Sequence, residues 1–206
     1  MGAVTVTAHE LSLPDGRLVY YPQFLDADAA DRLFDALLTD VPWQQATLNM
    51  FGRRIRAPRL TAWFGDCDAV YAYSGLRNQP LPWLPILLPV RSRVERLANQ
   101  DFNGLLLNLY RDGRDSVGWH SDNEPELGDN PMVASLTLGA SRRFVLRHRR
   151  NRVRPISIDP EHGSLLLMRA ETQRHWQHCV PKTRRTVGAR INLTFRRIYP
   201  ADGETR

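Results

Sequence analysis

The stretch "GWHSDNEPELGD", residues 118–129, places a histidine and a carboxylate two positions apart, at His120 and Asp122. Alternate side chains of a strand point to the same face, so both groups could bind one metal ion from a single strand. Two histidines and one carboxylate with open positions form the facial triad of non-heme Fe(II) oxygenases. The alternative is a solvated acidic loop, because H-x-D alone is a weak motif. Four later histidines could supply the third ligand: His148, His162, His175 and His178.

Two further stretches predict strands with their polar residues on one face. In "LLNLY" (106–110), Asn108 and Tyr110 alternate with leucines. If the leucines pack outward against helices, the polar faces line the interior of a barrel. A buried arginine without an anion is costly, so such an interior predicts a bound carboxylate or phosphate. The alternative is a solvent-facing polar strand face. In "RINLTFR" (190–196), the polar members of the alternation are Arg190, Asn192, Thr194 and Arg196.

The charge of the chain indicates a polyanionic partner. The formal net charge is +6, the pI is near 9.9, and Lys182 is the only lysine among many arginines. Arginine binds phosphates bidentately and stacks on bases, which lysine does not do. A genome with an arginine bias would explain the choice of arginine over lysine, but it would not explain the cluster "RHRRNRVR" (147–154). The density of this segment favours contact with phosphates over a merely solvated loop.

Composition also argues against several classes of protein. Cys67 and Cys179 are the only cysteines, too few for a disulfide framework. Cys179 adjoins His178, but no third group is visible that would orient a Cys/His nucleophile. No apolar run approaches the roughly 18 residues of a membrane span, and the N-terminus lacks the pattern of a secretory signal. We therefore expect a cytoplasmic protein, and nothing demands more than a monomer.

The expected elements favour one α+β domain that is mainly β. A chain of 206 residues with 42% hydrophobic residues can bury one substantial core. Residues 26–41 have leucines at helical spacing behind Asp26, a favourable N-cap, and a second helix is expected around 86–99. From residue 102 onward, short β-prone runs bounded by turns predict a sandwich or barrel. The expected domain spans 18–199, with loose segments at 1–17 and 200–206.

Five motifs in order resemble the AlkB family of Fe(II)/2-oxoglutarate-dependent nucleic-acid dealkylases, most closely its duplex-DNA-repair branch. They are "NLYRDGRDSVGWHSD", "SLTLGASRRFVLRH", "HGSLLLM", "HWQHCVP" and "RINLTFR". The resemblance implies a double-stranded β-helix (jelly roll) at 101–199, preceded by helices and a nucleotide-recognition lid at 18–100. It also implies Fe(II), the co-substrate 2-oxoglutarate and O2. The implied reaction demethylates N1-methyladenine and N3-methylcytosine in double-stranded DNA and releases formaldehyde, succinate and CO2.

The same resemblance assigns roles to residues. His120, Asp122 and His178 would bind iron, and His178 is preferred to His175 because the family's ligand precedes a small residue and "VP". Two alternatives stay open: the same iron chemistry on RNA or on a target that is not nucleic acid, and a non-catalytic nucleic-acid-binding jelly roll. The residues that would hold 2-oxoglutarate are Arg190, Tyr110 and Asn192 at its distal carboxylate, with Arg196 and Asn108 nearer the metal.

Contacts to the substrate are also implied by the resemblance. Tyr73 would stack on a flipped base that Tyr71 hydrogen-bonds, although both could be alternating core residues of a strand. Glu124 would read the base edge or be a mere loop carboxylate. Phe51, in "NMFGRR", would act as a wedge in the vacated stack or pack as an ordinary hairpin residue. The residues that would grip the backbone are Arg147, His148, Arg149, Arg150, Arg152 and Arg154.

Overall fold

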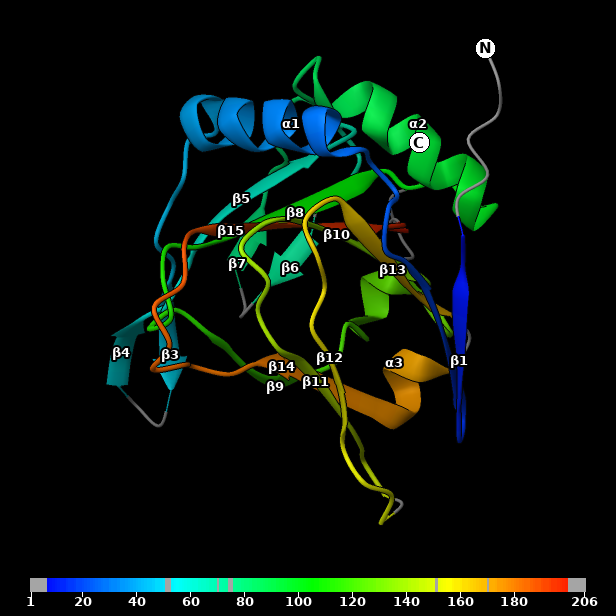
Figure 1. The fold of residues 1–206 in the computed structure, drawn as a ribbon. Helices are drawn as coiled ribbons and strands as arrows, with labels where there is room; N and C mark the ends of the chain where they lie inside the picture. The colour runs from blue at the N-terminus through cyan, green and yellow to red at the C-terminus, as the bar shows by residue number, and fades with distance from the viewer. Residues whose placement is uncertain are drawn as a thin grey trace.

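Two antiparallel sheets stack face to face in this computed structural model, which describes residues 7–50, 53–69, 71–73, 76–150, 152–169 and 171–199 (Figure 1). The larger sheet has seven strands in the order β1-β2-β13-β10-β15-β8-β5. Their bounds, in that order, are His9–Leu13, Gly16–Tyr21, Ser164–Arg169, Val133–Gly139, Arg190–Arg196, Gly104–Tyr110 and Leu60–Gly65. The smaller sheet has the order β12-β11-β14-β9, with bounds Ile156–Ile158, Phe144–His148, Trp176–Val180 and Val117–His120. This architecture is the mainly β jelly roll that the family resemblance implies.

Two short hairpins accompany the sheets. The first pairs β3 (Thr47–Met50) with β4 (Arg53–Arg56), and the second pairs β6 (Tyr71–Tyr73) with β7 (Leu76–Asn78). Figure 1 shows the β3–β4 hairpin on the side of the molecule opposite β1. A short α3 (Thr172–His175) lies between β13 and β14 in the chain, and a 3-10 turn (Pro125–Leu127) follows β9.

Two helices cover one face of the large sheet (Figure 1). Helix α1 spans Ala27–Asp40 and begins where the sequence predicts, because the Asp26 side chain accepts a hydrogen bond from the Ala29 amide at 2.8 Å. Helix α2 spans Leu87–Ala98 and ends at Asn99 in the left-handed conformation. Each helix turns a stripe of apolar residues, such as Leu33 and Val94, toward the sheet.

The faces of β15 divide as the alternation predicts. Ile191, Leu193 and Phe195 are fully buried in the core that the large sheet shares with the helices. Each such side chain contributes about 1.5–3 kcal/mol by leaving water. The opposite, polar face of β15 is therefore turned toward the small sheet, which positions Arg190 and Arg196 between the two sheets.

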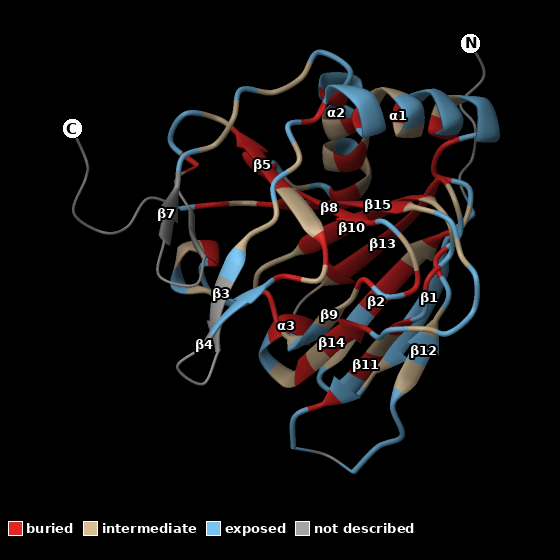
Figure 2. Cartoon of the chain, turned by 90° about the vertical axis from the view of Figure 1, so that its left-hand side faces the viewer, coloured by how far each residue is buried: buried red, intermediate tan, exposed pale blue. Residues whose placement is uncertain are grey.

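A second apolar core fills part of the space between the sheets. Trp176 is its largest member, and its indole N–H donates to the Pro14 carbonyl at 2.8 Å, which ties the β1–β2 turn to the small sheet. Figure 2 shows buried residues in red on the facing strands of both sheets. The other members of this core include Leu18, Tyr110, Val133, Phe144, Leu146, Leu166, Met168 and Val180.

Three features differ from the sequence analysis. Residues 9–13, expected in a loose segment, form β1 because they pair in register with β2 from His9–Tyr20 to Leu13–Gly16. Strand β9 ends at His120, so Asp122 lies in the turn beyond the strand that both were expected to share. Strand β5 was not expected and forms an edge of the large sheet. Among the described residues, no helix is long and apolar enough to cross a membrane.

Candidate active site

His120, Asp122 and His178 come together between the two sheets. Strands β9 and β14 are neighbours, and His120 pairs with His178 in their register. The potential ligand atoms of the three residues lie within 4.8 Å of one another, and His178 Nε2 is 3.8 Å from Asp122 Oδ2. The two imidazole rings are 4.3 Å apart at an angle of 64°, so in-plane lone pairs can meet at one point. Two histidines and a carboxylate are suitable donors for Fe(II).

The surroundings of each imidazole suit a metal ligand. His120 Nδ1 lies 2.9 Å from the Gly118 carbonyl oxygen. A carbonyl accepts only, so in the neutral form of the ring Nδ1 carries the proton and Nε2 keeps a lone pair that can bind a metal. Burial, together with the neighbouring His120, lowers the pKa of His178 to about 3. His178 is therefore unprotonated at neutral pH.

Asp122 is held by two contacts from distant parts of the chain. Arg196 Nη2 donates to its Oδ1 at 2.6 Å, and the buried Gln173 accepts from its backbone amide at 3.0 Å. Burial alone would raise the pKa of the Asp122 carboxyl, but Arg196 and the two histidines lower it to about 2. The carboxylate is therefore charged and fixed in direction, although it lies beyond the end of β9.

A buried guanidinium on β15 lies beside the cluster's pocket. Arg190 is 1% exposed, and its Nη2 donates to Thr137 Oγ1 at 2.9 Å. Its Nε and Nη1 are buried without a hydrogen-bond partner among the residues that the structure describes. Tyr110 faces Arg190 across the β15–β8 pairing, with the guanidinium 5.2 Å from its ring. Unpaired donors on a buried cation are costly, so this position fits the distal carboxylate of 2-oxoglutarate.

Polar side chains of β8, β10 and β15, together with Arg59 just before β5, also line the pocket. Asn108 and Asn192 are cross-strand partners. Arg59, just before β5, donates to Asn108 Oδ1 at 2.8 Å, and Asn192 Nδ2 donates to Ser135 Oγ at 2.8 Å. All four line the pocket with His120, Asp122 and His178. Sequence reasoning missed Arg59, Ser135 and Gln173, because none of them belongs to a motif and each meets its partner only in the fold.

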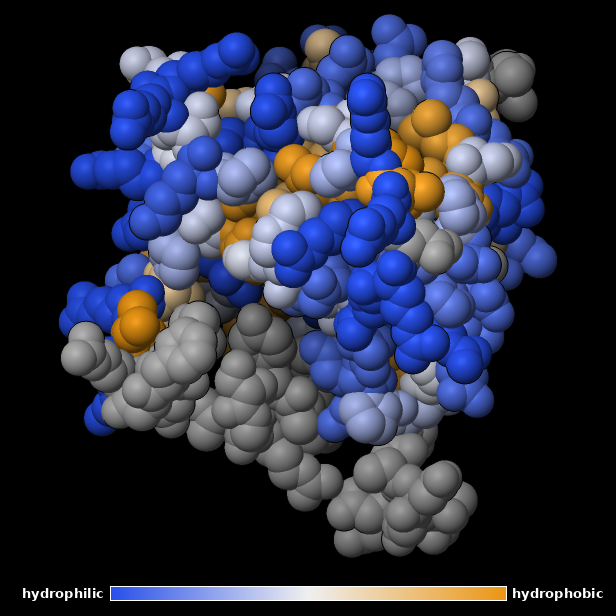
Figure 3. Space-filling model, turned by 90° about the horizontal axis from the view of Figure 1, so that it is seen from below, coloured by the Kyte–Doolittle hydropathy of each residue, from blue (hydrophilic) through white to orange (hydrophobic). Residues whose placement is uncertain are grey.

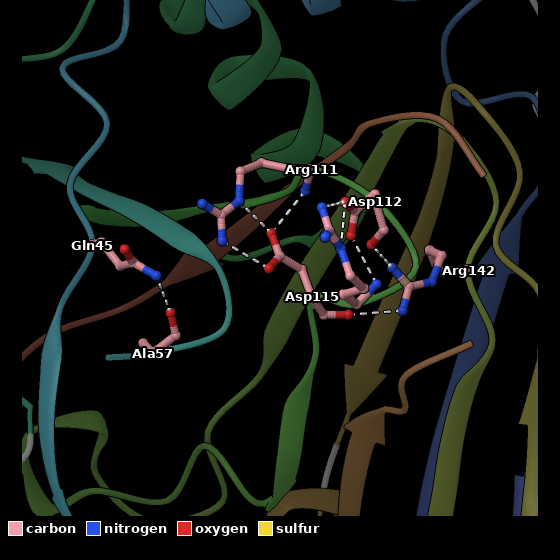
Figure 4. Close-up of polar contacts among 7 residues, drawn as sticks. Gln45, Ala57, Arg111, Asp112, Asp115 and Arg142 are labelled. Carbon is pink, nitrogen blue, oxygen red and sulfur yellow. Dashed lines mark hydrogen bonds and ion pairs between the residues drawn. The ribbon is translucent and has the colours of Figure 1, made fainter. Parts of the chain in front are cut away.

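The loop between β8 and β9 is fixed by two arginines (Figure 4). Arg111 Nε donates to Asp115 Oδ2 at 2.8 Å. The buried Arg142 donates to the carbonyls of Asp112, Asp115 and Pro181 at 2.8–2.9 Å. Pro181 follows β14 directly, so Arg142 joins the segment before His120 to the segment after His178. These contacts fix the two strands that carry the histidines.

The other histidines that sequence reasoning left open lie elsewhere. His162 Nδ1 accepts from the Gly139 amide at 2.7 Å, and its Nε2 is 3.2 Å from Asp31. His148, His175 and Asp15 form a second group whose ligand atoms lie within 4.8 Å. The rings of His148 and His175 are nevertheless stacked at 18°, so their in-plane lone pairs do not converge on one ion. His148 Nδ1 also accepts the Arg150 amide hydrogen at 3.1 Å, which places the proton of the neutral ring on Nε2, near Asp15.

Only some of the residues predicted to contact the substrate are among those that the structure describes. Glu124 is half-buried, and its Oε2 has no hydrogen-bond partner among the described residues. Phe51 lies outside the described residues, as do the side chains of Tyr71 and Tyr73 on β6, so their roles stay predictions. The arginines of the basic segment are exposed, on or just beyond β11: Arg147, Arg149, Arg150, Arg152 and Arg154.

Known proteins are similar to this chain in sequence. Residues 17–196 match the family described as the 2OG-Fe(II) oxygenase superfamily. Alpha-ketoglutarate-dependent dioxygenase alkB homolog 3 of Mus musculus is 43% identical over 204 residues, covering 93% of this chain and 71% of the relative. DNA oxidative demethylase ALKBH2 of Mus musculus is 39% identical over 181 residues, covering 83% of this chain and 76% of the relative.

Solved structures with lower identity show the same fold. OsALKBH1 superposes with a TM-score of 0.60 at 18% identity, covering 92% of this chain and all of that chain (100%). A prolyl hydroxylase from Trichoplax adhaerens, in complex with a peptide of the hypoxia inducible factor oxygen degradation domain, gives 0.62 at 16% identity, with coverage of 88% and 83%.

The fold and the matched family define a class: a dioxygenase that depends on Fe(II) and 2-oxoglutarate and consumes O2. The donor set between the sheets and the unpaired donors of Arg190 fit that class. The identity to its relatives, 43% and 39% over most of the sequence, narrows the class further, and the chain belongs to the AlkB family.

Proposed function

We propose that this enzyme repairs DNA by removing methyl groups from N1-methyladenine and N3-methylcytosine. The methyl carbon leaves as formaldehyde, while 2-oxoglutarate and O2 are converted to succinate and CO2. The name of the ALKBH2 relative, a DNA oxidative demethylase, supports DNA as the substrate class. The basic character of the chain, with a net charge of +6, supports a polyanionic substrate.

One observation carries the proposal. A three-residue cluster able to bind a metal lies in the same pocket as the polar faces of β8 and β15, and Arg190 beside it keeps two buried donors unpaired. A dicarboxylate that chelates the metal at one end and reaches Arg190 at the other satisfies both features. The juxtaposition therefore supports an oxygenase site rather than a metal site of purely structural use.

The residues divide into two sets. In the proposed assignment His120, Asp122 and His178 hold Fe(II), while Arg190, Tyr110 and Asn192 bind the distal carboxylate of 2-oxoglutarate. Iron with bound 2-oxoglutarate and O2 supplies the oxidation of the N-methyl carbon.

Arg196 and Asn108 lie at the metal-chelating end. Arg196 neutralises Asp122 at 2.6 Å and keeps it from turning toward other groups. Arg59 donates to the side-chain carbonyl oxygen of Asn108, so the amide N–H groups of Asn108 are left to donate to the co-substrate. The chain's own contribution is thus orientation and exclusion of water, because most of these side chains are buried between the sheets.

Recognition of the flipped base is assigned to the lid and to the turn after β9. Tyr73 stacks on the base and Tyr71 hydrogen-bonds it in this proposal. Glu124 Oε2, which is buried and unpaired among the described residues, accepts from the exocyclic amino group of adenine or cytosine. Phe51 fills the stack that the base leaves, and the exposed arginines of 147–154 bind the phosphates.

The test is a reaction loaded without oxygen with Fe(II), 2-oxoglutarate and a duplex carrying N1-methyladenine, then opened to air. We expect formaldehyde and unmodified adenine, both absent when 2-oxoglutarate is omitted. Succinate without base repair would keep the oxygenase and overturn the substrate. Parallel duplex DNA, single-stranded DNA and RNA substrates decide the nucleic acid, and Phe51→Ala should reduce duplex repair more than single-strand repair. An equal loss of repair on duplex and on single-stranded DNA would contradict the role of Phe51 as a wedge.

A further inference from the structure

The outer face of the small sheet carries an exposed tryptophan directly behind the candidate iron site. In β9, His120 points between the sheets, so the preceding Trp119 points away from them. Trp119 is 38% exposed, whereas the comparable Trp176 on the inner side is 1% exposed. Figure 3, which views the molecule from below, shows hydrophilic residues around small apolar areas on this side. A large apolar ring at such a position has no role in the core.

Neighbouring strands hold this ring in one orientation. The Arg147 guanidinium lies over the Trp119 ring at 4.2 Å from its centroid. Gln177, the cross-strand partner of Arg147 on β14, accepts from its Nε at 3.2 Å and from its Nη2 at 3.0 Å. Arginine, glutamine and tryptophan thus form a row across three strands. A fixed π-surface with a stacked guanidinium is the type of surface on which a nucleobase stacks.

A second arginine, Arg149, contacts the same segment. Arg149 Nη2 donates to Ser121 Oγ at 2.9 Å, and the Arg149 amide donates to the His175 carbonyl at 2.8 Å. Ser121 and Trp119 flank His120 in sequence. The two arginines therefore contact the residues on either side of a candidate iron ligand, and the exposed charges of Arg150 and Arg152 continue beyond them.

We propose that Trp119, Arg147, Gln177 and Arg149, here called the outer platform, bind a nucleotide that neighbours the modified one on the same strand. Its base stacks against Trp119 and Arg147, and its phosphate contacts Arg149. The occupant follows from charge complementarity: the platform adjoins a dense run of exposed arginines, which favours a polyanion over an apolar peptide. This inference rests on the proposed function, since the bound nucleotide belongs to the same nucleic-acid strand as the modified base that enters the pocket.

The experiment compares two single-stranded oligonucleotides with one N1-methyladenine each, of about 3 and about 12 nucleotides, which bracket the site sizes of strand-binding surfaces. For each protein we measure the ratio of the two dissociation constants with Fe(II) replaced by Mn(II). Loss of base stacking costs roughly five-fold or more in affinity, so Trp119→Ala and Arg147→Ala should reduce the advantage of the longer strand by at least that factor. Trp119→Phe should retain part of the advantage because phenylalanine still stacks.

Arg96→Ala is the matched control, because Arg96 is an exposed arginine on α2, on the far side of the large sheet. It should leave the ratio at the wild-type value. Tryptophan emission gives an independent signal: the long strand should quench it in the wild type and quench it less in Trp119→Phe.

Three outcomes would overturn the inference. An unchanged ratio in both platform variants would mean that no nucleotide binds there. Equal weakening of the short and long strands, together with loss of Mn(II), would mean that Trp119 acts only by supporting His120. If Arg96→Ala reduces the advantage of the longer strand as much as the platform variants do, the effect comes from the net charge of the protein and not from the outer platform. Demethylation of the N1-methyladenine duplex by the wild type tests the proposed function separately, and failure of that reaction removes both proposals.

Discussion

His120 and His178 meet at 64° between two paired strands, whereas His148 and His175 are stacked at 18° at the end of a strand and a short helix. Each pair has an aspartate within reach, and both groups place their ligand atoms within 4.8 Å. The difference lies in what surrounds the rings. A carbonyl beside His120 Nδ1 leaves Nε2 with a lone pair, while an amide N–H beside His148 Nδ1 leaves Nε2 with a proton.

The two aspartates differ in the same way. Asp122 is 3% exposed and is held by Arg196 and by Gln173. Asp15 is exposed in the β1–β2 turn, where it lies 3.3 Å from His148. Composition and proximity alone therefore do not define a metal site. The partners of the ligands decide which nitrogen is available and whether the lone pairs converge.

Substitution of one histidine from each cluster tests this comparison with the largest expected effect. His178→Ala should lose more than about 100-fold in turnover, because removal of a ligand exceeds the cost of removing its supporting residues. His175→Ala should retain turnover within a few-fold of the wild type. Succinate release and Fe(II) binding are the measurements. Equal losses in both variants would show that the second group also holds a required metal.

Arg190→Met probes the buried cation beside the pocket of the first cluster. Removing one partner of a buried charged pair costs about 3–5 kcal/mol, so the KM for 2-oxoglutarate should rise by two orders of magnitude or more. Without 2-oxoglutarate the variant should melt no lower than the wild type, because a buried charge with unpaired donors has been removed.

Arg197→Met is the control, since Arg197 directly follows β15, is partly exposed and lies over the ring of Tyr199. A parallel rise in KM in this control would contradict the role of Arg190. So would an Arg190→Met variant that 2-oxoglutarate still stabilises to the wild-type extent in a thermal melt.

Gln173→Ala removes a supporting contact while leaving all three possible ligands in place. Its effect on Fe(II) affinity should be about 10–100-fold, the range found for supporting residues of metal sites. The reason is that the buried Asp122 amide loses its acceptor. Titration with Fe(II) under anaerobic conditions measures the affinity, and Gln100→Ala, at a partly exposed glutamine just after α2, is the control. Wild-type affinity in Gln173→Ala would show that β9 positions Asp122 unaided.

His148→Ala should affect stability rather than chemistry, and it is the smallest effect expected. The variant loses the contacts to the Arg150 amide, to Asp15 and to the Trp176 ring. A loss of about 1–3 kcal/mol is typical for buried hydrogen-bonding groups. The melting temperature should fall by several degrees while Fe(II) binding is unchanged. Tighter binding of a second equivalent of Zn(II) by the wild type than by this variant would argue for a second metal site.

The sequence predicted the strands that alternate strongly, and it failed where tertiary contacts decide. The alternation in 190–196 predicted which residues of β15 meet the helices and which face the small sheet. The stretch 9–13 carries little apolar signal, and its strand exists because Gly16–Tyr21 pairs with it.

The candidate site divides along the same line. His120, Asp122 and His178 were singled out by residue type and motif, and the fold brings them together. Gln173 is 51 residues from Asp122 and Arg59 is 49 residues from Asn108, so no local pattern could have indicated these contacts. The parity argument for Asp122 assumed that the strand continues to this residue. Strand β9 ends two residues earlier, at His120, and the contact with Gln173 holds Asp122 instead.

The order of strands in the large sheet constrains when the protein can fold during synthesis. Strand β15 is the last of the described strands in chain order, yet it lies in the interior of the sheet, between β10 and β8. Until the ribosome has released residues 190–196, the edges of β8 and β10 have no partner and can pair with other chains. Both Arg190 and Arg196 arrive with this strand. A nascent chain that already exposes all three possible iron ligands therefore still lacks the arginines that complete the site.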